Sequence, residues 1–456
     1  AASDVYKRQG VTDETWVCAA GLGNEIPDYK LVVEKGLQDV IRRIEEKRAS
    51  LDMLDPESLK KKHFLDAALL SNQAVVNLAS RISEKCKEVA ESCGDPKTKK
   101  ELTDLAEVLK RVPLRPAETF QEAVQSIFIV LLAVHLESNG HAISLGRFDQ
   151  YVYPLYKKDI EEGRITKEQA LEILECFFIK CNELNKLRSW PDTEFFMGYQ
   201  MFINMAVCGQ TVDGKDATND VSLLCIQACR ELKLITPSVS IKYFDGTKDE
   251  VLQDALEAAI EHKGGMPAFY NDNAFIKILR NMGIAEEDLV DWSPDGCIEA
   301  SIPGKWDFAA KGPWLNVEKV LEITLNNGVD PATGHLFKAT DKKIEDCSSM
   351  EEIFDEYKKM LKYFMDLNCL TEHINDEIHI QQDINAFRSS LVYDCIERAM
   401  DLVEGGSVYS ADGGPTAGTI SAGDSLAALD EIVFNQKLLT MEQVLHAMST
   451  NYEDME

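Results

Sequence analysis

The order of apolar and polar residues predicts a helix-rich N-terminal third. From residue 30 to about residue 110, apolar residues recur three and four positions apart, as in LVVEKGLQDVIRRIEEKRASL, which is the period of an amphipathic helix. Pro113 interrupts this region. The following stretch, 117–137, is apolar almost all round and therefore predicts a buried helix.

The middle of the chain alternates between helix-like and strand-like segments. A helical region begins at Thr166, a residue typical of an N-cap, and continues to about residue 187. Short segments at 238–244 and 267–271 have the composition of strands and are separated by the helix-like stretch 249–262. This alternation predicts an α/β fold with at least partly parallel strands, as one compact unit beneath a helical N-terminal layer.

Composition and charge exclude several kinds of partner. The chain carries 78 acidic and 48 basic residues, a net charge of −30, which disfavours nucleic acid and anionic lipid. No apolar run approaches the roughly 20 residues of a membrane-spanning helix, so no membrane association is expected. Twelve cysteines are scattered along the chain, several within apolar helical runs, which favours a reduced, cytoplasmic setting over a disulfide framework.

Both ends of the sequence are expected to be cut. The first ten residues, AASDVYKRQG, lack an initiator Met and a signal-peptide pattern, and they need not be native sequence. At the other end, helical periodicity continues to Met448 and then stops.

One irregular segment carries the candidate chemistry. Prolines and glycines oppose a regular helix between residues 291 and 315. In extended backbone, the thiol of Cys297 and the carboxylate of Glu299 face the same way, while Ile298 faces the other. A thiol beside a potential base is a reactive pair. The alternative is an inert, buried cysteine near a solvated glutamate, and spacing alone favours that alternative.

Several separated stretches resemble the glycyl radical enzymes, and most closely their dehydratase and lyase branch. The resemblance extends over nearly the whole chain. The matching stretches are PDYKLVVEKGL (27–37), ESNGHAISLGRFDQYVYPLY (137–156), GGMPAFYND (264–272), GCIE followed by PGK (296–305) and DSLAALDEIVFNQKLLTMEQVL (424–445).

The resemblance implies a fold and a cofactor. The expected fold is a ten-stranded α/β barrel of two antiparallel half-barrels surrounded by helices, with residues 1–456 forming a partial pyruvate formate-lyase-like domain. Inside such a barrel, one loop carries the cysteine and another carries a glycine that holds a radical. A partner activase, which uses S-adenosylmethionine and an iron–sulfur cluster, installs that radical, and no bound metal is expected. The implied assembly is a cytoplasmic homodimer.

The sequence departs from the family in one large respect. The family's Arg-Val-x-Gly-Tyr motif does not occur here, so the glycine radical domain is expected to be absent from this chain. The chain alone should then not convert its substrate. It is expected either to be a truncated sequence or to need a separate small subunit that bears the glycine.

The resemblance also implies roles for the reactive pair. Cys297 would take a hydrogen atom from a carbon beside a hydroxyl, and Glu299 would take the proton of that hydroxyl, so that a neighbouring substituent is expelled. Acetyl transfer of the formate C-acetyltransferase kind uses two adjacent cysteines, and Gly296 and Ile298 flank the cysteine here. A decarboxylase or carbon–carbon bond-forming enzyme on the same barrel, and an inert fragment or metabolite-binding scaffold, stay open as alternatives.

Five further residues match positions that bind substrate in the family. Asn24 stands where the diol dehydratases have a histidine, and an asparagine cannot act as an acid near neutral pH. His141 matches a substrate-binding histidine, although it could also cap a helix. Lys311 and Trp314 follow the cysteine loop, and Phe202 lies in an apolar run; ordinary packing is the alternative for all three. A lysine and a tryptophan in the pocket favour a carboxylated or bulkier hydroxylated substrate over glycerol.

Overall fold

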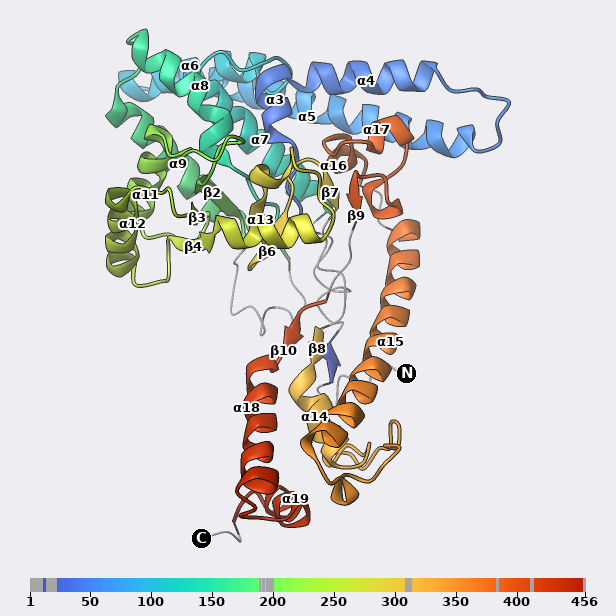
Figure 1. Ribbon diagram of the computed structural model, residues 1–456. Helices are drawn as coiled ribbons and strands as arrows, with labels where there is room; N and C mark the ends of the chain where they lie inside the picture. The colour runs from blue at the N-terminus through green and yellow to red at the C-terminus, as the bar shows by residue number, and fades with distance from the viewer. Residues whose placement is uncertain are drawn as a thin grey trace. The chain divides into compact units, whose positions relative to one another are not determined.

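Each of the two compact units of the chain combines segments that lie far apart in the sequence (Figure 1). Unit 1 comprises residues 1–19, 310–378 and 412–456, and unit 2 comprises residues 20–309 and 379–411. The computed structural model describes residues 11–13, 23–138, 140, 142–187, 190, 193, 201–307, 314–382, 385–410 and 414–453.

The helical N-terminal layer predicted from the sequence is part of unit 2. Its helices are α3 (Tyr29–Lys35), α4 (Leu37–Ala49), α5 (Ser58–Ser92), α6 (Pro96–Arg111), α7 (Phe120–Ser138), α8 (Phe148–Glu161) and α9 (Lys167–Asn182). Helix α5 packs along both α4 and α6. The N-cap predicted at Thr166 is confirmed, because its side chain accepts the Gln169 N–H while the Gln169 side chain accepts the Thr166 N–H.

Helix α7 is the buried helix predicted for 117–137. It is 19 residues long and by length and composition could cross a membrane, so the statement that no apolar run approaches that length was wrong. In the fold, 56% of its most apolar stretch is buried. Ile127 and Val130 belong to the hydrophobic core of unit 2. A core helix that is covered on most sides has the same composition as a membrane span.

The described part of unit 2 contains a three-stranded parallel sheet. Strands β2 (Asn204–Cys208), β3 (Ser238–Tyr243) and β4 (Ala268–Asn271) pair in that order. Helix α11 (Asp220–Leu232) connects β2 to β3, and α12 (Asp249–His262) connects β3 to β4. These are βαβ crossovers, which parallel strands require. The predicted α/β class and parallel strands are confirmed, whereas β2 was not identified from the sequence.

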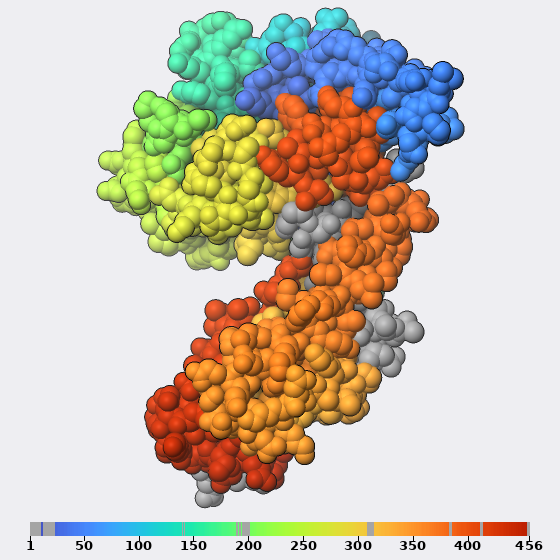
Figure 2. Space-filling model, turned by 45° about the vertical axis from the view of Figure 1, so that its right-hand side comes forward, coloured from blue at the N-terminus to red at the C-terminus, as the bar shows by residue number. Residues whose placement is uncertain are grey.

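The rest of unit 2 contains short elements, some of which pack on the parallel sheet and others on the N-terminal helices. In Figure 2 residues 385–410, drawn in orange-red, lie against the blue N-terminal helices, and α16 (Ala386–Ser390) packs on α5. These elements are α13 (Asp272–Asn281), η1 (Leu289–Asp291), β5 (Ser293–Asp295), β6 (Glu299–Ser301), β7 (Trp306–Asp307), α16 (Ala386–Ser390), α17 (Cys395–Arg398), η3 (Leu402–Glu404) and β9 (Tyr409–Ser410).

Unit 1 has its own sheet and hydrophobic core. Strand β8 pairs antiparallel with β1 and parallel with β10, and the core includes Ile323, Phe364 and Leu429. Helix α15 begins in this unit. None of the cysteines in the described parts of the two units forms a disulfide. The elements are β1 (Thr12–Asp13), β8 (Trp314–Asn316), α14 (Val317–Leu325), η2 (Ile344–Asp346), α15 (Met350–Gln382), β10 (Thr416–Ala417), α18 (Thr419–Leu429), η4 (Asp430–Asn435) and α19 (Met441–Ser449).

Candidate active site

Cys297 lies at the tip of a tight β-hairpin. Strands β5 and β6 pair antiparallel, with Asp295 opposite Glu299, and residues 296–298 form the turn between them. The backbone at Cys297 is therefore not extended, and the expectation that Cys297 and Glu299 face one way by strand alternation was wrong. The Glu299 carboxylate nevertheless lies beside Cys297, because it accepts hydrogen bonds from the backbone of the turn.

Gly296 allows this turn to be tight. Its φ is +58°, in the left-handed region that favours glycine. A Cβ at this position would lie 2.8 Å from Glu299 Oε2, 3.1 Å from Asn24 Nδ2 and 3.4 Å from the Ala142 Cβ. Asn24 and Ala142, which come from distant parts of the sequence, therefore line the base of the turn. Among the predicted substrate-binding residues that the structure describes, Asn24 is brought to the hairpin by these contacts.

The Glu299 carboxylate is bonded to the backbone of the turn. Its Oε2 atom accepts the N–H of Cys297 at 2.7 Å and the N–H of Ile298 at 2.9 Å. Hydrogen bonds from N–H groups to a charged carboxylate are stronger than those between neutral groups. Oε1 takes part in neither bond. The carboxylate is thereby held beside the cysteine with one oxygen committed to the turn.

Cys297 is an exposed residue, yet its thiol is partly buried and its surroundings keep it protonated. Partial burial, together with the negative charges of Glu299 and Asp295, raises the pKa of the Cys297 thiol to about 11. At neutral pH the residue is therefore a thiol and not a thiolate. An intact S–H bond is what a residue needs if it is to exchange a hydrogen atom rather than act as an ionic nucleophile.

Two side chains that the sequence analysis did not single out contact the hairpin tip. Asn204 Nδ2 donates to the Gly296 carbonyl at 2.5 Å, and the Tyr270 hydroxyl donates to the Cys297 carbonyl at 3.2 Å. Asn204 begins β2 and Tyr270 lies on β4. A polar asparagine inside the apolar run FINMAV was the available signal, because a polar side chain in a buried strand needs a specific partner.

Two buried carboxyl groups lie beneath the turn. Burial, assisted by the negative charges of Glu299 and Glu25, holds the pKa of Asp295 well above its usual range. Burial also raises the pKa of Glu25 to about 8, against the opposing charge of Arg388, whose Nε is 3.0 Å from Glu25 Oε1. Both carboxyl groups therefore keep their protons to a higher pH than an exposed carboxyl group does.

A buried lysine anchors the strand that leads into the hairpin. Lys242 Nζ donates to the carbonyls of Val290 and Trp292, each at 2.8 Å, and lies 3.3 Å from Asp272 Oδ1. Burial, together with the Arg147 guanidinium, lowers the pKa of Lys242 to about 7. These contacts bind the segment before β5 to strand β3 and to the start of α13, and so place the base of the hairpin against the parallel sheet.

The other predicted residues are not joined to the hairpin by these contacts. Phe202 is half-buried with φ +54° and directly precedes the Ile203–Asn204 entry into β2. Trp314 begins β8 in unit 1, where it pairs with Asp13. His141 and Lys311 lie outside the described residues. The substrate-binding roles of all four stay predictions.

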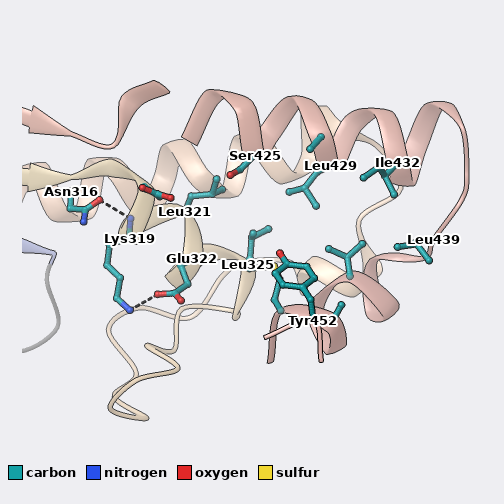
Figure 3. A pocket seen from close by; sticks show the side chains of 15 residues that line it. Asn316, Lys319, Leu321, Glu322, Leu325, Ser425, Leu429, Ile432, Leu439 and Tyr452 are labelled. Atoms are coloured by element: carbon teal, nitrogen blue, oxygen red, sulfur yellow. Dashed lines mark hydrogen bonds and ion pairs between the residues drawn. The ribbon is translucent and has the colours of Figure 1, made fainter. Parts of the chain in front are cut away.

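A large groove in unit 1 has a different character. It has a volume of about 590 Å³ and lies between α14, α18 and α19 (Figure 3). Leu325, Leu429 and Met448 give it an apolar wall, and the ion-paired Lys319 and Glu322 lie toward one end. None of the predicted site residues that the structure describes is among the residues lining this groove.

The fold and the hairpin define an α/β protein that presents one protonated thiol and one anchored carboxylate at the tip of a β-hairpin. The family model described as "Pyruvate formate lyase-like" matches residues 3–456. The chain belongs to this family, that of the glycyl radical enzymes, whose members use a glycyl radical and act on small molecules.

Curated proteins and solved structures agree with this assignment. The chain is 33% identical over 93% of its length to trans-4-hydroxy-L-proline dehydratase of Clostridioides difficile, covering 54% of that protein. It is 31% identical over 94% of its length to isethionate sulfite-lyase of Oleidesulfovibrio alaskensis, covering 53% of that protein. A solved structure from work on 1,2-propanediol dehydration in Roseburia inulinivorans superposes with a TM-score of 0.94 at 34% identity, over 100% of this chain and 57% of that chain.

Two conclusions follow from these comparisons. The chain has the barrel fold of the glycyl radical enzymes, as the resemblance implied. It also spans about half the length of the curated relatives that it matches.

Proposed function

We propose that the protein catalyses a radical elimination, as a dehydratase or a related C–X lyase, on a small hydroxylated substrate. Cys297 is the hydrogen-abstracting residue and Glu299 the general base. The observation that carries the proposal is the bonding of Glu299 Oε2 to the N–H of Cys297 and of Ile298, because it holds a base beside the thiol. The similarity to trans-4-hydroxy-L-proline dehydratase and to isethionate sulfite-lyase supports the same class of elimination reaction.

The protonation state of Cys297 suits this role. A glycyl radical, installed by an activase that uses S-adenosylmethionine and an iron–sulfur cluster, would supply the one-electron oxidation of the thiol. Because the pKa of Cys297 is raised to about 11, the thiol retains the hydrogen atom that such an oxidation removes. The sulfur then takes a hydrogen atom from the substrate carbon: a C–H bond breaks homolytically and an S–H bond forms. At the end of the cycle the sulfur returns that atom to the product.

Glu299 handles the proton of the substrate hydroxyl. Its Oε2 is bonded to the turn, so Oε1 is the atom that accepts this proton. Loss of the proton pushes electron density onto the substrate carbon, and the bond to the neighbouring substituent then breaks with its electron pair. A positioned general base contributes roughly 10²–10⁴-fold to rate.

The substrate is expected to differ from glycerol. Asn24 lies at the base of the hairpin turn and can bind a hydroxyl, but it cannot protonate a departing group. Lys311 and Trp314, if they line the same pocket, favour a carboxylated or bulkier hydroxylated substrate. His141 and Phe202 are proposed to contact it. The protein is further proposed to act in the cytoplasm as a homodimer, without nucleic acid, membrane or bound metal.

The experiment is activation of the protein, expressed at the full length of its reading frame, under strictly anaerobic conditions with its activase. A glycyl doublet in electron paramagnetic resonance is expected, followed by turnover in a panel of 1,2-propanediol, glycerol, trans-4-hydroxy-L-proline and isethionate. Cys297→Ser should keep the doublet and abolish turnover. Release of carbon dioxide from an aryl acetate would point to the decarboxylase alternative, and absence of the doublet would refute the proposal.

A further inference from the structure

The two peptide groups that flank Cys297 are both held by side chains. In the first, between Gly296 and Cys297, the carbonyl accepts from Asn204 Nδ2 at 2.5 Å and the N–H donates to Glu299 Oε2 at 2.7 Å. In the second, between Cys297 and Ile298, the carbonyl accepts from the Tyr270 hydroxyl at 3.2 Å and the N–H donates to the same Oε2 at 2.9 Å. Every backbone polar group next to Cys297 is thus bonded.

These bonds come from outside the hairpin as well as from within it. Glu299 belongs to the hairpin and moves with it, whereas Asn204 and Tyr270 belong to the parallel sheet. A three-residue turn exposed at a hairpin tip would otherwise be among the more mobile parts of a fold. The carbonyl bonds therefore tie the tip directly to the parallel sheet.

The sheet residues are themselves buried and fixed. Asn204 is 2% exposed and Tyr270 is 9% exposed. The hydroxyl of Ser240, a fully buried residue of β3, donates to Asn204 Oδ1 at 3.2 Å, which orients the Asn204 amide so that its N–H₂ faces the hairpin. Asn204, Ser240 and Tyr270 come from three adjacent strands, so the hairpin tip is bonded to a rigid, three-strand platform.

We propose that Asn204 and Tyr270 are positioning residues for Cys297, and that their bonds to the two flanking carbonyls set where the sulfur lies. The catalytic meaning of this role rests on the proposed function. Transfer of a hydrogen atom requires close approach of donor and acceptor, and a displacement of about 1 Å can reduce rate by about 10²-fold. Neither residue needs to touch the substrate to have this effect.

The test measures alkylation of Cys297 by iodoacetamide as a function of pH in the full chain, with each cysteine quantified by peptide mass spectrometry. Tyr270→Phe removes one hydroxyl and keeps the ring. The matched control is Tyr243→Phe, which removes a hydroxyl from a half-buried tyrosine of β3 that takes no part in these bonds. Asn204→Ser is the second variant, because serine is too short to reach the Gly296 carbonyl.

Tyr270→Phe is expected to alkylate Cys297 about 10-fold faster at pH 8 and to shift its pH profile to lower pH. A loosened tip gives the sulfur more water, which favours the reactive thiolate, and one pH unit corresponds to a factor of about ten. Tyr243→Phe should match the wild type. The exposed Cys176 and Cys369 serve as internal references, and the buried Cys181 and Cys225 report any general opening of unit 2.

An unchanged Cys297 profile in a folded Tyr270→Phe protein would overturn the proposal. A proportionate rise in the alkylation rates of Cys181 and Cys225 would also overturn the proposal, because Tyr270 would then contribute to the general stability of unit 2 and not to the position of Cys297. In the activated enzyme, kcat should fall about 10-fold or more with little change in KM. The alkylation assay needs neither radical nor substrate, so if the profile shifts while Cys297→Ser retains turnover, the proposed function fails and the positioning role stands.

Discussion

Replacement of Gly296 by alanine tests whether the hairpin tip is as tightly built as its contacts indicate. The residue has φ +58°, and a non-glycine residue in the left-handed region costs roughly 1–2 kcal/mol. The new methyl carbon would lie 2.8 Å from Glu299 Oε2, far inside van der Waals contact. A free carboxylate could swing away at little cost, but this one would have to give up its bonds to the N–H of Cys297 and of Ile298.

The expected destabilisation follows from these contributions. Hydrogen bonds to a charged group contribute about 1.5–3 kcal/mol each, so weakening both adds roughly 3 kcal/mol to the backbone cost, for a total of about 4 kcal/mol. The matched control is Gly163→Ala. Gly163 has φ +67°, and no heavy atom of the described residues lies within 4 Å of the position that a Cβ would take, so that variant should show the backbone cost alone.

Opening of unit 2 can be measured as alkylation of the fully buried Cys181 under native conditions. Since 1.4 kcal/mol corresponds to a factor of ten, Gly296→Ala should accelerate this alkylation by roughly 10³-fold and Gly163→Ala by about 10-fold. Equal acceleration in the two variants would show that the Glu299 bonds do not restrain the turn, and the reasoning would be refuted.

Three further predictions concern charges near the hairpin. Glu299→Gln should lower turnover by about 10²–10⁴-fold and should lower the pKa of Cys297 below about 11 in the alkylation profile, because a negative charge beside the thiol is lost. Lys242→Met should destabilise unit 2 by roughly 3–5 kcal/mol, measured by Cys181 alkylation, because Asp272 and the carbonyls of Val290 and Trp292 all lose their buried hydrogen-bond donor; a change below about 1 kcal/mol would contradict this. In the folded protein Glu25 holds its proton up to about pH 8, whereas in the unfolded chain it releases the proton near pH 4.5. The free energy of unfolding should therefore fall as pH rises through this window, by up to about 1.4 kcal/mol per pH unit. Glu25→Gln should flatten that slope.

Much of the local structure was accessible from residue patterns. The N-cap at Thr166, the strands at 238–244 and 267–271 and the buried helix at 117–137 follow from short-range rules of periodicity and capping, and each is present within a few residues of its predicted bounds. The residue pattern gave the wrong backbone conformation at Cys297. Strand alternation assumed an extended backbone there, whereas Gly296 begins a turn that reverses the chain.

The sequence by itself determined the family, the α/β class and the choice of Cys297 and Glu299 as candidate catalytic residues. These depend on the identity of residues and on their order over short stretches of the chain. Tertiary structure alone decided how the two are held. Asn204 and Tyr270 lie 92 and 27 residues before the residues whose carbonyls they bind, and no periodicity relates such positions. They meet the hairpin because parallel strands joined by helical crossovers bring distant segments side by side, which is a property of the folded sheet.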